Sequence, residues 1–447
     1  MKRGSVILLL ALMSLFFPFT GFAYVIGDVN SDNRVDLTEA INALQVTGGV
    51  RTPLSASATI NVPADIPTIQ QAIDAAKSGD IINVAAGTYT GALTVANKAL
   101  TIQGAGKAST IITSGSTSTT ALTVDGARMI VVSGITLKDS YTGILAMRGA
   151  AVEVTNAIVQ GANYRGILII DNATAKLTDV TVQQNSGHGI HVTRSSSITL
   201  SGTVTSSYNT SRGIEISQSS SIHLSNAIVT VNNNGDRGIN LINNSALLEE
   251  KSSLTVQDNG GSYGVYVLSG SSFLMQNNAT LLSERNAIGI RAASAASLWT
   301  NDTSQITIRA CGTGLSIKDG SNAQLSGTLT VENTTGTGSG VQMDRNSSLQ
   351  MNNSLLISND VVGNGVGISM TSGAQIAFTP FPQQTIVIQN NNTGIWASDG
   401  SIGGSGSVTI KNNVNDLNVN FGSKVSLPAG SYGTCTTDGT VLGITCP

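Results

Sequence analysis

A glycine followed by an aliphatic residue recurs along most of this 447-residue chain, at intervals of 23 to 27 residues. The series consists of Gly143, Gly166, Gly189, Gly213, Gly238, Gly264, Gly289, Gly314, Gly340, Gly367 and Gly394. A regular period of this length indicates structural units that stack on one another, one unit per repeat. Apolar and polar residues alternate after each glycine, as in the Ile-His-Val that follows Gly189, which predicts a short strand with one buried face.

Each repeat contains one or two further short segments of this kind, such as 197–200 and 202–205, separated by clusters of Ser, Thr, Asn and Gly that favour turns. No segment of the repeats has the periodicity of an amphipathic helix, which argues against solenoids built from helices. Short strands stacked in register, up to three in each coil, form a parallel β-helix. The sequence therefore predicts an all-β solenoid.

The composition limits the classes of partner. Only 11% of the residues are charged and the formal net charge is −3, so no strong overall field attracts nucleic acid or an acidic membrane. Aromatic residues make up 4% of the chain, whereas small and β-branched residues are abundant. This composition suits a narrow core in which similar side chains stack from coil to coil.

The first residues resemble a secretion signal, which we expect to span 1–23. Two basic residues follow Met1, an apolar stretch runs from Val6 to Phe17, and the small residues around Ala23 predict a cleavage site. A membrane anchor is the alternative, although the apolar run is short for a span. We therefore expect a secreted or cell-surface protein, or a periplasmic one, with no membrane span in the mature chain.

A loop rich in oxygen ligands follows the signal. Loop positions 1, 3, 5, 7, 9 and 12 are held by Asp28, Asn30, Asp32, Arg34, Asp36 and Glu39. Side-chain oxygens at five of these positions, with the Arg34 carbonyl at the other, match the spacing of an EF-hand calcium site. Asn33 stands where the loop usually has Gly, and Asn tolerates the same left-handed conformation. The sequence predicts calcium binding here; a solvated acidic turn is the alternative.

The segment 59–89 predicts how the solenoid begins. Pro67 suits a first helical turn, Ile69, Ala72 and Ile73 form an apolar stripe, and Gly79 ends the predicted helix at 66–78. A helix laid across the end of a β-helix covers its apolar interior and its unpaired strand edge.

This segment closely resembles the start of the pectate-lyase-like superfamily of right-handed parallel β-helices. The matching residues are Ile69, Gln70, Gln71, Ala72 and Ile73, then Gly79 and Asp80, then Gly87, Thr88 and Tyr89. The resemblance covers about 59–420 and implies a right-handed coil. It assigns no activity, because the superfamily includes lyases, glycosidases, esterases, epimerases and proteins without catalysis.

The remaining segments are small. Residues 24–50 resemble one half of a dockerin, a paired calcium-loop module that docks exported enzymes onto scaffolds, which suggests a protein partner for this module. A linker is expected at 51–58 and a C-terminal cap segment at 421–447. In an oxidising compartment Cys435 and Cys446 are expected to form a disulfide, which leaves Cys311 as a buried free thiol.

Residues at equal offset from the repeat glycine are expected to stack into columns. One residue before the glycine stand Arg165, His188, Arg212 and Arg237, in four consecutive repeats. Cations about 5 Å apart repel one another, so an anionic ligand such as a uronate chain would relieve the repulsion. In a regular strand, residues at this offset would point to the same side as the buried aliphatic residues. The chain must therefore bend at the glycine for these side chains to reach water. The alternative is that the side chains simply point into solvent.

A second column lies two residues after the glycine, on the predicted outward face. Its members are His191, Glu215, Asn240, Tyr266, Arg291 and Trp396. Together with Tyr266 and Arg291, the neighbouring Lys318, Asp319, Asp344 and Arg345 give the densest charged patch of the chain. We consider Lys318 and Arg291, with Asp344, as candidate catalytic groups, since a β-elimination lyase needs a base and a cation beside the uronate. Salt bridges between adjacent coils explain the same pattern.

The pattern does not contain a complete catalytic set. Of the residues expected in a polygalacturonase, only the Gly-His-Gly around His188 is present, and paired carboxylates for hydrolysis are missing. The sequence therefore favours an exported, calcium-binding β-helix that binds an acidic polysaccharide, with Arg165, His188, Arg212, Arg237, Tyr266 and Trp396 as candidate ligand-binding residues. The alternatives are a non-catalytic adhesion or matrix protein and a polysaccharide lyase.

Overall fold

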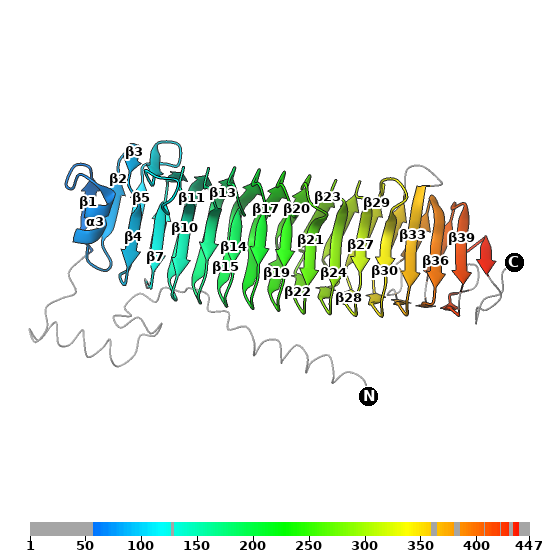
Figure 1. Ribbon diagram of the computed structural model, residues 1–447. Coiled ribbons are helices and arrows are strands. Elements are labelled where there is room, and N and C mark those ends of the chain that lie inside the picture. Colours follow the sequence, from blue (N-terminus) through cyan, green and yellow to red (C-terminus); the bar gives the residue numbers. More distant parts are fainter. Residues whose placement is uncertain are drawn as a thin grey trace, which may run out of the picture. The chain divides into compact units, whose positions relative to one another are not determined.

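The computed structural model describes residues 57–437 except 127–128, 359–363, 380–384, 406, 421 and 429–431. The chain divides into two units, Met1–Ser57 and Ala58–Pro447. The second is a parallel β-helix, so the predicted all-β solenoid is confirmed (Figure 1). The predicted signal segment, calcium loop and linker fall outside the described residues or at their margin. None of the helices in the described part is long and apolar enough to span a membrane.

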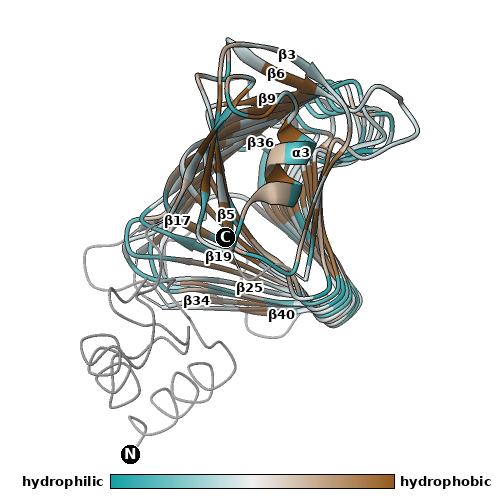
Figure 2. Cartoon of the chain, turned by 90° about the vertical axis from the view of Figure 1, so that its left-hand side faces the viewer, coloured by the Kyte–Doolittle hydropathy of each residue, from teal (hydrophilic) through white to brown (hydrophobic). Residues whose placement is uncertain are grey.

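The coil has three faces, which Figure 2 shows from the end of the solenoid. One face is a sheet of 15 parallel strands. In Figure 1 its labelled members run side by side from β4 to β39. Its strands are β4 (Leu93–Ala96), β7 (Leu122–Asp125), β10 (Thr142–Met147), β12 (Arg165–Ile169), β14 (Ile190–Val192), β16 (Ile214–Ile216), β18 (Ile239–Leu241), β21 (Tyr263–Leu268), β24 (Ile288–Ala293), β27 (Thr313–Ile317), β30 (Ser339–Met343), β33 (Asn364–Thr371), β36 (Asn391–Ser398), β39 (Asn415–Asn420) and β41 (Cys435–Thr437).

The other two faces are joined into one 26-stranded sheet, because four long strands run through both of them. The shared strands are β11 (Ala151–Gln160), β13 (Thr174–Gln183), β15 (Ser197–Ser207) and β17 (Ser221–Asn232). The second face also contains β1 (Thr59–Val62), β2 (Ile81–Val84), β5 (Leu100–Gly104), β8 (Ile130–Ser133), β19 (Ala246–Glu250), β22 (Ser272–Gln276), β25 (Ser297–Thr300), β28 (Asn322–Leu325), β31 (Ser348–Met351), β34 (Gln375–Phe378), β37 (Ser401–Gly404) and β40 (Lys424–Ser426). The third face contains β3 (Gly87–Thr90), β6 (Thr110–Thr113), β9 (Thr136–Lys138), β20 (Ser253–Gln257), β23 (Thr280–Glu284), β26 (Gln305–Arg309), β29 (Thr328–Glu332), β32 (Leu355–Ser358), β35 (Thr385–Gln389) and β38 (Ser407–Lys411).

Only glycine fits at the repeat position, because adjacent coils leave no space there for a Cβ atom. A Cβ at Gly213 would lie 2.3 Å from Cγ1 of Val231 and 2.9 Å from the carbonyl oxygen of Gly238 in the next coil. That carbonyl accepts a hydrogen bond from the Ile214 amide at 2.9 Å, so it cannot move away without breaking the ladder. The glycine therefore lets adjacent coils approach to hydrogen-bonding distance, which explains its recurrence.

The interior contains stacked aliphatic side chains and one column of buried asparagines. The column consists of Asn185, Asn209, Asn234, Asn259 and Asn286. Asn209 Nδ2 donates to Asn234 Oδ1 at 2.9 Å, and Asn234 Nδ2 donates to Asn259 Oδ1 at 3.0 Å. The buried thiol of Cys311 follows Asn286 and donates weakly to the carbonyls of Ser283 and Arg309. The expected buried cysteine thus ends the asparagine column.

The first coil is closed by the helix α3 (Ile69–Ala75), which lies across the near end in Figure 2. Ile69, Ala72 and Ile73 are buried, as the apolar stripe predicts. The helix is shorter than the predicted 66–78, because the Thr68 side chain caps it and leaves Pro67 outside the first turn. On the adjoining edge strand, Asp65 accepts from the Asn61 amide at 2.7 Å and so occupies a donor that another strand could use.

Candidate functional site

The outward column of the 15-stranded sheet forms as the spacing predicts. His191, Glu215, Asn240, Tyr266 and Arg291 are direct neighbours in the parallel register of β14, β16, β18, β21 and β24. Although these residues point outward, His191 is only 7% exposed, Glu215 5% and Asn240 0%. Other side chains must therefore cover them.

The covering groups are the residues that stand before the repeat glycines. Arg212 binds Glu215 through Nη1, and its Nε donates to Asp236 at 3.1 Å. His188 Nε2 lies 3.3 Å from Glu215 Oε2. Arg237 and Asn240 are joined in the same way, through a 3.2 Å hydrogen bond from Nη1 to Oδ1. The chain bends at the glycine as expected, and the two predicted columns form a single surface.

Burial controls the charge in the middle of this surface. Desolvation lowers the pKa of His191 to about 3, with further lowering by Arg165, and desolvation also lowers the pKa of His188 despite the nearby Glu215. Both imidazoles are therefore neutral at pH 7. Burial is the largest single influence on Arg212 and opposes its charge, but the hydrogen bonds and negative charges of Glu215 and Asp236 together outweigh it and raise the pKa of Arg212. The repulsion that the sequence predicts is relieved within the protein at His188 and Arg212.

A tyrosine and arginine group lies at the N-terminal end of this surface. The rings of Tyr141 and Tyr164 stack with centroids 5.1 Å apart, and both are exposed. The guanidinium of Arg165 lies 4.0 Å from the Tyr164 centroid, a cation–π contact. We call Tyr141, Tyr164 and Arg165 the first clamp.

A larger group of the same kind lies at the C-terminal end. Tyr263 and Tyr266 stack with centroids 4.4 Å apart. Arg237 Cζ lies 4.9 Å from the Tyr266 centroid, and Arg291 Cζ lies 5.4 Å from the Tyr263 centroid. Arg291 also donates to the Tyr263 hydroxyl at 3.2 Å. We call Tyr263, Tyr266, Arg237 and Arg291 the second clamp.

Five buried nitrogens on this surface have no hydrogen-bond partner among the described residues. They are Nε of Arg165, Arg237 and Arg291, Nδ1 of His191 and Nδ2 of Asn240. Within the same described part, the ion pairs involve none of these three arginines. An unmet buried polar group costs about 1–3 kcal/mol, so five such groups on one face make this surface the candidate site.

The sequence analysis missed three members of the clamps. Tyr141 and Tyr164 stand two residues before a repeat glycine, and Tyr263 stands one before. Their recurrence at nearly the same phase as the cations is the signal that could have identified them. A tyrosine occurs at this phase in only some of the repeats, so the sequence does not show a continuous aromatic column.

The charged patch around Lys318 is satisfied mainly by its own ion pairs. Arg345 Nη1 lies 2.7 Å from Asp319, and its Nε lies 3.1 Å from Asp344. Thr371 donates a further hydrogen bond to Asp344 at 2.9 Å. Burial, followed by the charge of Arg291, lowers the pKa of Lys318. The salt-bridge interpretation thus describes Asp319, Asp344 and Arg345, whereas Arg291 belongs to the second clamp.

The other predicted site residues lie apart from this surface or outside the described residues. Trp396 continues the outward column between Ser369 and Asn418, five strands beyond Tyr266 and thus about 24 Å along the axis. The predicted calcium ligands Asp28 to Glu39 and the predicted disulfide partner Cys446 lie outside the described residues. Within residues 57–437, as far as they are described, no group of three or more His, Cys, Asp or Glu side chains is placed to hold a metal.

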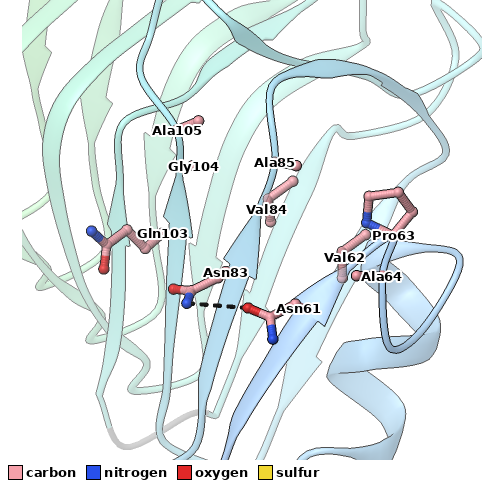
Figure 3. Close-up of a pocket in the computed structure, with 10 residues that line it drawn as sticks. All are labelled: Asn61, Val62, Pro63, Ala64, Asn83, Val84, Ala85, Gln103, Gly104 and Ala105. Carbon is pink, nitrogen blue, oxygen red and sulfur yellow. Dashed lines mark hydrogen bonds between the residues drawn. The ribbon is translucent and has the colours of Figure 1, made fainter.

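A separate pocket of about 370 Å³ lies at the first coils, on the second face (Figure 3). Its side-chain amides are Asn61, Asn83 and Gln103, and Asn83 Nδ2 donates to Asn61 Oδ1 at 3.4 Å. Val62, Pro63 and small residues form the remaining wall. The lining residues carry no charge, so this pocket does not share the chemistry of the clamps.

The comparisons with known proteins concern the fold. Residues 98–252 match the family model of the right handed beta helix region. The chain is accordingly a right-handed parallel β-helix, which is the class that its resemblance to the pectate-lyase-like superfamily implies. No curated protein matches the sequence.

Solved structures are similar at low identity. The A-module of mannuronan C-5 epimerase AlgE6 from Azotobacter vinelandii is 14% identical, with a TM-score of 0.41 over 85% of this chain and 95% of that chain. An alginate lyase from Paenibacillus is also 14% identical, with a TM-score of 0.37 over 71% and 98%. The catalytic unit of an alpha-1,3-glucanase from Streptomyces thermodiastaticus is 12% identical, with a TM-score of 0.45 over 89% and 70%.

Proposed function

We propose that this protein binds an acidic polysaccharide along the outward face of the 15-stranded sheet, between Tyr141 and Arg291. The observation that carries the proposal is the row of five buried nitrogens without partners, three of which belong to arginines that form no ion pair in the described part of the chain. Four of these nitrogens, the three arginine Nε atoms and Asn240 Nδ2, are donors, so the complementary ligand must supply acceptors to them. The neutral His191 donates through Nε2 to Ser217, so its Nδ1 is an acceptor that suits a ligand hydroxyl.

The charge of the face favours an anion. Glu215 and Asp236 carry two negative charges against the one positive charge of Arg212, and His188 and His191 are neutral at pH 7 because burial lowers the pKa of each. Arg165, Arg237 and Arg291 add three positive charges, so the face remains positive overall, and its positive charge lies on these three arginines. A carboxylate can accept two hydrogen bonds from one guanidinium, which is the strongest pairing that such a group offers.

The arrangement also favours a polymer of sugars. The binding groups repeat along the solenoid axis, with one coil every ~4.8 Å, so they can contact successive units of a chain that lies parallel to the axis. Tyrosine rings present an apolar surface and a hydroxyl group, which together suit the faces and the hydroxyl edges of sugar rings. Export, predicted from the first 23 residues, would place this face where such polymers occur.

Binding of polygalacturonate and alginate, measured by isothermal titration calorimetry, tests the proposal. We expect wild type to bind at least one of them, with an affinity that falls as salt rises. The double variant Arg237→Ala/Arg291→Ala should lose at least tenfold in affinity, whereas Arg194→Ala, an exposed arginine paired with Asp171 at 3.2 Å, should not. Equal affinity of all three proteins would contradict the proposal, as would no binding by wild type.

Cleavage by β-elimination is the second candidate function. It rests on Lys318, whose pKa is lowered by burial and by Arg291, as a general base requires. An unsaturated uronate product, followed by its ultraviolet absorbance, should then appear with wild type and be lost in Lys318→Ala. Polysaccharide binding without product would favour the non-catalytic adhesion or matrix role.

We also propose that the loop from Asp28 to Glu39 binds calcium, as its ligand spacing implies. Titration of the full chain with calcium should give a heat that is absent from Asp32→Ala/Glu39→Ala. The variant Arg34→Ala is the matched control, since only a backbone carbonyl is expected from that position. A wild-type heat no larger than that of the double variant would rule the site out.

A further inference from the structure

The two clamps have the same construction. In each, an arginine guanidinium lies over a tyrosine ring, the tyrosine stacks on a second one, and the arginine Nε has no partner among the described residues. The guanidinium faces are therefore covered by rings, while the Nε position on the edge remains unbonded. A carboxylate that meets such an edge finds an oriented donor that has already lost its water contacts.

The section between the clamps has a different character. Its central charge is Glu215, which is nearly fully buried and already receives hydrogen bonds or close contacts from Arg212 and His188. A ligand carboxylate placed there would meet the negative charge of Glu215 and Asp236. The unmet groups of this section, the acceptor Nδ1 of His191 and the donor Nδ2 of Asn240, are neutral. They suit hydroxyl groups better than carboxylates.

The register fixes the separation of the clamps. Arg165 begins β12 and Tyr263 begins β21, and the strands between them in the sheet are β14, β16 and β18. Four coil steps of ~4.8 Å correspond to about 19 Å along the axis. A pyranose residue with its glycosidic oxygen is about as long as one coil step, so a chain of about five residues reaches from one clamp to the other.

From this arrangement we infer that the face selects acidic oligosaccharides by length. Shorter chains bind one clamp at a time, and chains of about five residues or more bind both. The inference rests on the proposed function, because it assumes that acidic sugars are the ligand. Binding the second clamp is then an intramolecular event, which adds affinity without any new kind of contact.

The test is calorimetric titration of the full-length protein with galacturonate and mannuronate oligosaccharides of two to eight residues. We expect similar weak affinities for the shortest chains, a rise of at least about tenfold near five residues, and a plateau beyond. In Tyr164→Ala/Arg165→Gln the first clamp is lost, so long chains should bind only as well as short ones. The variant Arg194→Ala should keep the rise.

Three results overturn the inference. If affinity grows by a constant factor with each added residue, or if the rise survives loss of the first clamp, the clamps do not act as a pair although the proposed function stands. If no oligosaccharide of any length binds wild type, the proposed function fails as well. The conservative variant Tyr164→Phe/Arg165→Lys keeps ring and charge, and its partial retention of the rise shows that loss in the first variant does not reflect misfolding.

Discussion

Two columns of polar side chains run through the same coils, one inside the solenoid and one on its outward face. Inside, Asn209 and Asn234 each donate to the next asparagine and also to a main-chain carbonyl. Outside, Arg237 and Asn240 use one hydrogen bond with each other and leave Nε and Nδ2 without partners among the described residues. The same coils thus contain an inner column whose side-chain amides are hydrogen-bonded and an outward column in which some nitrogens are not. This difference is what we expect if the inner column stabilises the fold and the outward column binds the proposed ligand.

The charged turn around Asp344 and Arg345 is a third case. The Arg345 side chain is 60% exposed, and it pairs with Asp344 of its own coil and Asp319 of the previous one. Exposed ion pairs contribute little free energy. Ion pairs and hydrogen bonds between side chains therefore stabilise the protein substantially only where these side chains are buried. Changes to the three regions should separate these effects.

The largest effect is expected inside. Replacing Asn234 with Ala leaves the Asn209 amide and the Ser206 carbonyl without their partners in a buried position, which should lower the free energy of unfolding by about 2–4 kcal/mol. Urea unfolding followed by circular dichroism measures it. Thr255→Ala, on the outer surface of β20, serves as control and should change it by less than about 0.5 kcal/mol. A comparable fall in the free energy of unfolding in both variants would show that the inner asparagine column has no special role in stability.

Removing an outward arginine should affect binding instead. Arg237→Ala deletes a charged donor, so the affinity for an acidic polysaccharide should fall about 10- to 100-fold, which corresponds to 1.5–3 kcal/mol. Stability should change by less than about 1 kcal/mol, because the loss of the hydrogen bond to Asn240 is offset by removal of an unmet buried group. Titration and urea unfolding of the same preparation measure both quantities. A large drop in stability would show that the arginine has a structural role.

Glu249 is an exception inside the solenoid. It is fully buried between Leu224 and Met275 of the adjacent coils, and neither carboxylate oxygen has a hydrogen-bond partner among the described residues. Burial raises its pKa well above the ordinary value, which the nearby Thr280 amide offsets only in part, since that amide donates to the Ser252 carbonyl at 2.9 Å. Glu249→Met should therefore raise the free energy of unfolding by about 1–3 kcal/mol at pH 7.

The pH dependence identifies the cause of that gain. A carboxyl whose pKa is raised by folding destabilises the protein as pH rises from the unfolded pKa, near 4.5, to the folded one, and costs less below that window. The advantage of Glu249→Met should therefore shrink as pH falls toward 4.5. Glu249→Gln, which keeps a polar group but no charge, should gain less. An advantage independent of pH would show that packing, not charge, produces it.

The smallest effect is expected at the turn. Arg345→Ala removes both ion pairs of this residue, yet it should change the free energy of unfolding by no more than about 1 kcal/mol and leave polysaccharide affinity unchanged. The same two measurements apply. A loss of affinity like that of Arg237→Ala would extend the binding face to this turn.

The outward column could be predicted from the sequence because stacking forces residues at equal offset into neighbouring positions. His191, Glu215 and Asn240 therefore met as expected. Their burial could not be predicted, since it depends on how Arg212 and Arg237 turn at the glycine. The inner column escaped notice for a different reason. Asn185, Asn209 and Asn234 stand four residues before the repeat glycine, but Asn259 stands five before it and Asn286 three, so one fixed offset aligns only the first three. Their burial inside the turn also has no signal in the alternation of apolar and polar residues.

The close approach at each repeat glycine also determines how such a chain can change length during evolution. Duplication or loss of one entire coil keeps every glycine beneath a carbonyl of its neighbour, and the inside and outside columns continue unbroken. An insertion of one residue within a strand would place a side chain where the glycine meets the neighbouring carbonyl. It would also turn the buried side chains of that strand outward and the exposed ones inward. Added or deleted residues should therefore accumulate at the turns, and the binding face should lengthen only by whole coils.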